Sequence, residues 1–293
     1  MLETYEILVI ALMASFMLLI FTGYPIAWVL AGVSFWFVVI ALWGAEAMDW
    51  DTFMLDRWVR FGVIVDRIWS QMQNSVLVAL PNFVFMGIML DKSGVADRLM
   101  QSFTRLFGSL QGGLAISVCA IGILLAASTG IVGASVVLLA TLSMPLMLAY
   151  GYSHRLASGV IAASGTLGIL IPPSIMLVIM ADQLSMSVGD LFMGAMVPGL
   201  LLGCLYVVYV VVIANLRRGI APPPADAPPL SAGVVLDALT AMAAPAALIL
   251  AVLGTIFFGI ATATEASAVG AFGAMLLAAA NRRLDLRVIR DVC

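Results

Sequence analysis

Long stretches without a charged side chain decide what this chain can fold into. Residues 7–45 and 113–153 contain no Asp, Glu, Lys or Arg, and shorter uncharged runs follow at 68–90, 156–181, 191–216 and 238–264. A helix rises about 1.5 Å per residue, so about 20 apolar residues cross the hydrocarbon core of a bilayer. Only 10% of all residues are charged, against about 25% in a soluble domain. The sequence therefore predicts an all-α polytopic membrane protein and excludes a soluble enzyme or a nucleic-acid-binding protein.

The uncharged runs divide the chain into two membrane parts joined by a proline-rich segment. The segment at 217–233 begins with Arg217 and Arg218 and contains five prolines, so we expect a cytoplasmic linker there. The turn at 23–27 resembles the one at 259–266, which favours an internal inverted repeat. The first repeat, 1–216, holds spans at 7–22, 26–45, 70–90 and 191–216, a re-entrant hairpin at 113–150 and a broken span at 156–181. Residues 234–293 are expected to begin a second repeat that is incomplete.

The basic residues predict the orientation of the chain in the membrane. With the N-terminus outside, 10 of the 13 Lys and Arg residues fall on the cytoplasmic side, where such residues near spans are retained. The C-terminus then also lies in the cytoplasm. The three remaining arginines belong to a mixed-charge segment at 49–67, which is expected to form an amphipathic helix on the membrane surface.

Residues 128–135, Ser-Thr-Gly-Ile-Val-Gly-Ala-Ser, interrupt the long uncharged run 113–153. The arms on either side are short for a full crossing and both run toward basic loops, so a re-entrant hairpin with its tip near the membrane midplane is preferred to two complete spans. An irregular backbone survives at that depth only where it lines a cavity or is buried in protein. The tip is therefore a candidate binding segment.

Residues 164–174, Ser-Gly-Thr-Leu-Gly-Ile-Leu-Ile-Pro-Pro-Ser, lie in the middle of the next apolar run. Pro172 and Pro173 remove two amide donors, and their rings clash with the carbonyls four residues earlier, so the helix is expected to unwind between Gly165 and Pro173. Unwound carbonyls and hydroxyls bind Na⁺ in transporters, while half-helix N-termini attract anionic groups. The alternative is that these glycines, serines and prolines serve helix packing alone.

Thr262, Thr264 and Glu265 stand at the predicted outer end of a span. Glu265 is a candidate functional carboxylate because ionisable groups are costly at membrane depth, but a structural role is favoured, in which a threonine caps the following helix. His154 is read as a solvated loop residue. No phosphate-binding loop, Cys/His metal spacing or hydrolase elbow is present, so the sequence predicts no enzyme.

Four motifs make the chain similar to the large membrane subunit of tripartite ATP-independent periplasmic (TRAP) transporters. They are Gly-Tyr-Pro-Ile-Ala at 23–27, the two broken segments at 128–135 and 164–174, and Gly-Ile-Ala-Thr-Ala-Thr-Glu-Ala at 259–266. The third is the most specific. The resemblance is collinear over essentially the whole chain. Two departures are that Ala263 stands where the family usually has proline, and that the family's large subunit continues for well over a hundred residues. A fragment, a truncated reading frame or one piece of a split protein is therefore expected.

The resemblance implies an elevator-type ion-transporter fold in a bacterial inner membrane. Its partners would be a small four-helix membrane subunit, a periplasmic substrate-binding protein and membrane lipid. It would import an organic anion, such as a C4-dicarboxylate, keto acid or sugar acid, with Na⁺ as the coupling ion. Segments 49–67 and 96–107 would be arms that brace the moving part. The alternatives are a membrane scaffold that transports nothing and a proton-coupled anion carrier.

The resemblance also assigns candidate site residues. The cation site and one wall of the substrate site would be formed by Ser128, Thr129, Gly130, Gly133, Ser135, Ser164, Gly165, Thr166, Gly168, Pro172, Pro173 and Ser174. Within this set, Na⁺ would be held at Ser128, Gly130, Ser135, Gly165, Thr166 and Gly168. Contributors from the second repeat would be Thr262, Thr264 and Glu265.

Overall fold

A computed structural model describes residues 3–52, 62–130, 132–217, 219–223 and 231–292. Every regular element in these ranges is helical, and five helices are long and apolar enough to cross a membrane. The chain divides into two compact units, residues 1–74 and 75–293. The fold class predicted from the uncharged runs is thus confirmed as an all-helical chain with membrane-length helices.

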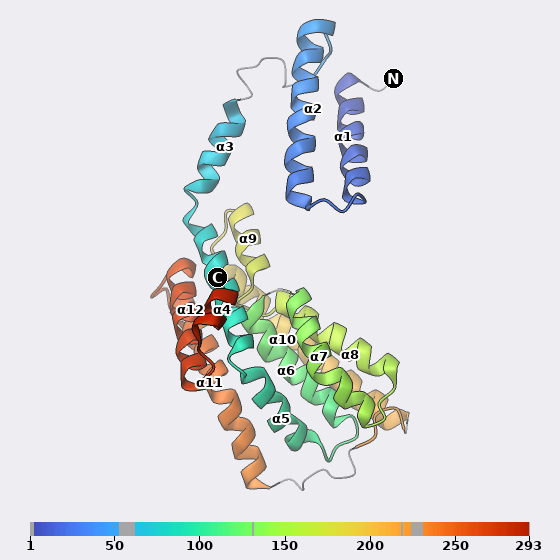
Figure 1. Cartoon of the computed structure of the whole chain (residues 1–293), viewed down its shortest axis with the longest axis vertical. Helices are drawn as coiled ribbons and strands as arrows, with labels where there is room; N and C mark the ends of the chain where they lie inside the picture. The colour runs from blue at the N-terminus through green and yellow to red at the C-terminus, as the bar shows by residue number, and fades with distance from the viewer. Residues whose placement is uncertain (1–2, 53–61, 131, 218, 224–230, 293) are drawn as a thin grey trace. The chain divides into compact units, whose positions relative to one another are not determined.

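The first unit contains a helical hairpin. Helices α1 (Thr4–Ile20) and α2 (Ile26–Met48) pack side by side (Figure 1). The turn between them contains Gly23, whose φ of 83° is one that glycine adopts without steric cost. Pro25 stands at the N-cap of α2, so it removes no helical hydrogen bond. Large apolar side chains on α2 such as Trp28 and Trp36 remain exposed, as expected of a surface that faces lipid.

The amphipathic segment predicted at 49–67 is only partly described. Residues 50–52 are not helical, residues 53–61 lie outside the described part of the chain, and helix α3 (Gly62–Met72) follows. The stretch 70–90, predicted as one span, is divided in the structure. Its first residues end α3, and a 3₁₀ turn (Ser75–Val78) then leads into α4 (Ala79–Lys92).

The second unit is built around four consecutive helices that run back and forth (Figure 1). Helix α5 (Val95–Phe107) buries one face against α6 (Gly113–Thr129) and α11 (Ala232–Phe257). This helix contains the arm predicted at 96–107. Helix α7 (Val132–Ala149) returns along α6, and α8 (His154–Thr166) packs against both.

Two further helical hairpins complete the second unit. Helix α9 (Ile175–Gln183) continues α8 after a break and is followed by α10 (Val188–Leu216), the longest helix described. Helix α11 ends in a turn at Gly259, with φ 67°, where the Ile260 amide donates to the Thr255 carbonyl at 2.9 Å. Helix α12 (Ala263–Ala280) then packs along α4, and α13 (Leu286–Val292) follows.

Several loops of the second unit meet at one end. The Gly112 amide donates to the Ala221 carbonyl at 3.1 Å, and the Ser153 amide donates to the Ile220 carbonyl at 3.0 Å. These bonds join the starts of α6 and α8 to the segment after α10. Arg155, in the first turn of α8, and Arg217, directly after α10, lie at this end, so the structure groups basic residues that the sequence placed on the same membrane side; the orientation itself stays a prediction.

Candidate functional site

Both interruptions predicted from the sequence are present in the backbone. Helix α6 ends at Thr129 and α7 begins at Val132, with Gly130 between them at φ 59°. Helix α8 ends at Thr166, a 3₁₀ turn covers Leu167–Ile169, and α9 starts only at Ile175. The helix therefore unwinds over the segment that contains Pro172 and Pro173, because neither proline can donate to the helical ladder.

The two breaks lie against each other, and this contact is the main feature of the site. A Cβ atom built on Gly130 would lie 3.0 Å from the Ile175 nitrogen and 3.5 Å from the Ser174 Cα. Only glycine combines so close an approach with a positive φ at no steric cost. The tip of the α6–α7 hairpin thus touches the start of α9.

A second close approach fixes the direction in which the broken segments cross. A Cβ atom on Gly165 would lie 3.0 Å from both the Cα and the nitrogen of Val136, one residue after Ser135. Gly130 contacts Ile175, whereas Val136, which follows Gly130 in the sequence, contacts Gly165, which precedes Ile175. Segments 128–135 and 164–174 are therefore antiparallel neighbours that share a backbone-to-backbone contact.

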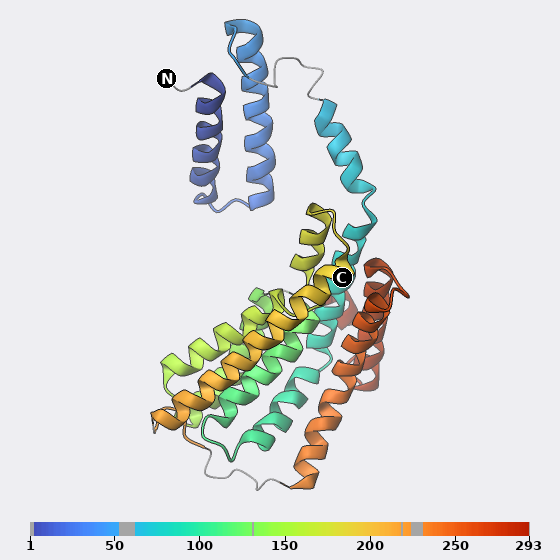
Figure 2. The same ribbon diagram turned by 180° about the vertical axis from the view of Figure 1, so that it is seen from behind.

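Helix α10 shows how deep this contact lies. Its 29 residues span about 43 Å. A Cβ atom on Gly199 would lie 3.1 Å from the Leu170 oxygen and 3.0 Å from Ile171. Gly199 is three residues from the centre of α10, so along the axis of that helix the break of α8–α9 lies about 5 Å from the midpoint. Figure 2 shows α10 running alongside the green α6–α7 hairpin and beyond its tip. If α10 crosses the bilayer, the breaks lie inside it.

The helix ends at the contact bring both signs of partial charge together. Helices α7 and α9 begin there and present amide groups, whereas α6 and α8 end there and present carbonyls. Ser174 is the N-cap of α9, but its hydroxyl donates to the Ile169 carbonyl at 2.9 Å and does not cap the helix. Free amides of a first turn attract anions, and freed carbonyls attract cations.

The remaining candidate residues of the two breaks fall into buried and exposed groups. Thr166 is exposed and its hydroxyl donates back to the Ala163 carbonyl at 2.7 Å, and Gly133 is exposed on the first turn of α7. The backbones of Ser128 and Thr129 belong to the last turn of α6, but their side chains lie outside the described part of the structure. Buried are Gly130, Ser135, Ser164, Gly165, Gly168, Pro172, Pro173 and Ser174.

The Thr262–Glu265 group forms a helix cap, which is the structural role favoured by the sequence. Thr262 Oγ1 accepts from the Glu265 amide at 3.3 Å, and Glu265 Oε2 accepts from the Thr262 amide at 2.8 Å. The Thr264 hydroxyl donates to the Ser75 carbonyl at 2.9 Å. This group therefore lies against the turn that leads into α4, whereas the closest neighbours of Gly130 and Gly165 are on α9 and α7.

Sequence reasoning missed the residues of α6 that pack against α8, the helix that ends at the break. A Cβ atom on Gly122 would lie 2.6 Å from Ser164 Cβ, and the Ser164 hydroxyl lies 3.5 Å from Cys119 Sγ. Cys119 and Gly122 are three residues apart on one face of α6. That spacing was available in the sequence, but nothing there identified α8 as the partner of this face.

Comparison with known proteins identifies the family of this chain. The family described as "Tripartite ATP-independent periplasmic transporter, DctM component" matches residues 13–293. The C4-dicarboxylate TRAP transporter large permease protein DctM of Pseudomonas aeruginosa is 34% identical over 209 residues, which cover 70% of this chain and 47% of the relative. The ectoine TRAP transporter large permease protein TeaC of Halomonas elongata is 30% identical over 214 residues, which cover 73% of this chain and 49% of the relative.

The name of a third relative joins the letters M and Q, for two components of the transporter, in one protein. The isethionate TRAP transporter permease protein DctMQ of Oleidesulfovibrio alaskensis is 32% identical over 202 residues, which cover 69% of this chain and 31% of the relative.

The chain spans about half the length of the first curated relatives it matches. Since the family match covers nearly the whole chain, the protein belongs to the DctM component family of tripartite ATP-independent periplasmic transporters, which is a family of transport proteins and not of enzymes.

Proposed function

We propose that this chain contributes to Na⁺-coupled import of an organic anion, and that segments 128–135 and 164–174 form the cation site and one wall of the substrate site. The observation that carries the proposal is the contact between Gly130 and the Ser174–Ile175 backbone. It brings two helix starts and two helix ends together within a helical bundle. Transporters use this arrangement because carbonyls at half-helix ends coordinate the ion, while the opposite ends favour an anion.

The oxygen atoms available at the contact are suited to a small hard cation. Backbone carbonyls and hydroxyls near Gly130, Ser135 and Gly165 are oxygen donors of the type preferred by such cations. Within the described residues, no group of three or more His, Cys, Asp or Glu side chains could hold a metal ion. A weakly held, exchangeable Na⁺ that enters with the substrate fits these donors better than a resident transition metal does.

The substrate class and the partners follow from the family and from the partial charges of the site. The amide groups at the starts of α7 and α9 favour a carboxylate, and two relatives carry C4-dicarboxylate in their names. A C4-dicarboxylate, keto acid or sugar acid is therefore proposed as the substrate, delivered by a periplasmic binding protein. The compound name of the DctMQ relative supports a small membrane subunit as a partner.

Ion-dependent stability of the purified complex tests the proposal. Na⁺ is expected to raise the apparent Tm and K⁺ is not, because a ligand that binds only the folded state stabilises it. Replacing Pro172 and Pro173 together with alanine should abolish the Na⁺ effect. The control Pro145→Ala changes a proline inside α7, away from the tip, and should keep it.

Each of the other outcomes has a distinct meaning. A Na⁺ effect that is unchanged in the double proline variant would contradict the proposed ion site. If neither ion affects the Tm of the unaltered protein, the chain is a scaffold whose breaks serve packing. Uptake into vesicles that follows a pH gradient and not a Na⁺ gradient would instead make it a proton-coupled carrier.

A further inference from the structure

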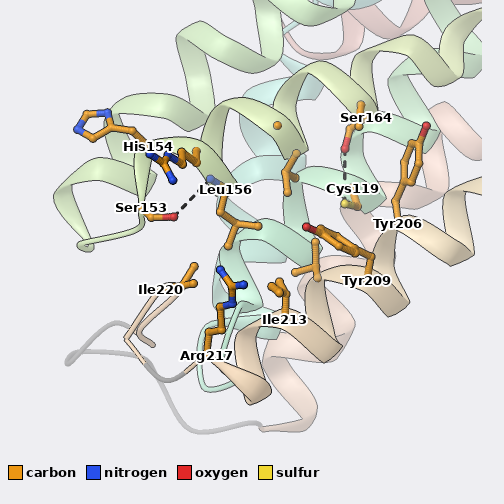
Figure 3. Close-up of a pocket in the computed structure, with 15 residues that line it drawn as sticks. Cys119, Ser153, His154, Leu156, Ser164, Tyr206, Tyr209, Ile213, Arg217 and Ile220 are labelled. Carbon is orange, nitrogen blue, oxygen red and sulfur yellow. Dashed lines mark hydrogen bonds between the residues drawn. The ribbon is translucent and has the colours of Figure 1, made fainter.

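A cavity of about 700 Å³ lies between α6, α8 and α10 (Figure 3); it includes none of the residues that meet at Gly130, and it shares only Ser164 with segments 128–135 and 164–174. Its inner end is closed by the hydrogen-bonded pair Ser164 and Cys119. Its other end lies at the loops where the Ser153 amide bonds to the Ile220 carbonyl. The cavity therefore runs along α8 from the basic loop end of the second unit toward the middle of the bundle.

The loop end of this cavity is positively charged. Arg155, in the first turn of α8, and Arg217, directly after α10, both line it, and Figure 3 shows Arg217 directed into the cavity. Among the described residues that line it, none is acidic and neither guanidinium forms an ion pair. Two arginines that line the same cavity favour the binding of an anionic group there.

The walls between the two ends are mostly apolar. The residues that line them include Leu156 and Val160 from α8 and Val210, Ile213 and Tyr209 from α10. Tyr209 is 60% exposed. On the same helix, the large apolar side chains Leu205, Val208 and Val212 are also exposed. The cavity therefore opens beside a surface that suits lipid chains, and its charged end carries the arginines expected near a membrane interface.

We propose that this cavity binds one anionic phospholipid, with its phosphate between Arg155 and Arg217 and one acyl chain along α8 and α10. Basic pockets between membrane helices recognise acidic headgroups in this way. A small soluble dianion fits poorly, because both cationic groups are at one end and the walls beyond them are apolar. At the inner end, the Ser164 hydroxyl forms a hydrogen bond with Cys119 Sγ, so these side chains offer no positive charge for the second anionic group of a dianion.

Native mass spectrometry of the purified complex, with phosphatidylglycerol or phosphatidylcholine added, tests this proposal. The unaltered protein should retain one phosphatidylglycerol and release phosphatidylcholine. The double variant Arg155→Gln, Arg217→Gln should bind phosphatidylglycerol about tenfold more weakly or worse, since each basic residue near the headgroup contributes to binding. Arg287→Gln with Arg290→Gln removes the same charge from α13, outside the cavity, and should retain the lipid. Equal binding by both double variants would overturn the proposal.

A second pair of variants tests the acyl-chain path without changing charge. Gly159 lines the cavity, and a Cβ atom there would meet nothing within 4 Å, so the Gly159→Leu variant should fold. Its leucine side chain should fill part of the cavity and displace the lipid. Gly194, another helical glycine with open space, lies outside the cavity and provides the control Gly194→Leu. Undiminished lipid retention in Gly159→Leu would refute the chain path. Displacement of the bound lipid by succinate would show that the cavity takes a soluble anion and would also refute the proposal.

Discussion

Replacing Gly130 with alanine tests whether the meeting of the two helix breaks is required for ion binding. The new methyl group would lie 3.0 Å from the Ile175 nitrogen, which cannot retreat unless the first turn of α9 moves. Gly259→Ala is the matched control. Gly259 also has a positive φ, 67° against 59° at Gly130, but a Cβ atom there would meet nothing within 4 Å.

The two glycines allow the cost of the close approach to be separated from the cost of the backbone conformation. A non-glycine residue in the left-handed region costs about 1–2 kcal/mol, and both variants carry this cost. Crowding in a packed interior adds about 1–3 kcal/mol, and only Gly130→Ala should carry it. In a chain of this size about 1 kcal/mol shifts Tm by about 2–4 °C. Gly130→Ala should therefore melt at least about 2 °C below Gly259→Ala.

The assay measures Tm for both variants in Na⁺ and in K⁺. Because Gly130→Ala displaces α9 from the hairpin tip, the stabilisation by Na⁺ should fall, whereas Gly259→Ala should keep the stabilisation found in the unaltered protein. Equal Tm values for the two variants would show that the tip does not touch α9. A lower Tm with a full Na⁺ effect would show that the contact is structural only.

Three further changes have defined outcomes. Gly165→Ala places a methyl group 3.0 Å from the Val136 backbone and should lower both Tm and the Na⁺ effect, as measured in the same assay. Thr262→Ala removes the cap of α12 and should cost about 1 kcal/mol in urea unfolding without altering the Na⁺ effect; a lost Na⁺ effect would give this group a direct role. Burial raises the pKa of Tyr152, so folding favours the neutral phenol and stability should fall as the pH rises through about 10. Tyr152→Phe should show a smaller loss between pH 9 and 11, and an identical loss would show that other groups cause it.

The local breaks could be predicted because their causes are local. Proline lacks an amide hydrogen and glycine tolerates a positive φ, so the interruptions at Gly130 and at Pro172–Pro173 follow from the residues themselves. The same holds for the cap at Thr262, since both of its reciprocal bonds join residues three apart in the sequence. Helix α10 begins three residues before the predicted span at 191–216 and ends at the same residue.

Contacts between distant segments were not available from one sequence. Val136 as the neighbour of Gly165, and Ile175 as that of Gly130, depend on how α7 and α9 are placed by the whole bundle. The division within 70–90 was missed for another reason. Gln73 and Asn74 are uncharged, so they do not interrupt a charge-free run, and the end of the helix there was not detected. Polar residues of this kind are nevertheless common where helices end.

The glycines of the second unit also bear on the alternative that the breaks serve packing alone. Gly122, Gly199 and Gly203 are helical, and a side chain at each would collide with α8, the break after it, or α6. These glycines draw α6, α8 and α10 together, as small residues do in membrane bundles. Gly130 differs because it ends a helix, with a positive φ, against the backbone of another helix's first turn. Packing alone would be satisfied by continuous helices with small residues. An interrupted helix gives up hydrogen bonds of the helical ladder, and the proposed binding of an ion and a substrate would offset this cost.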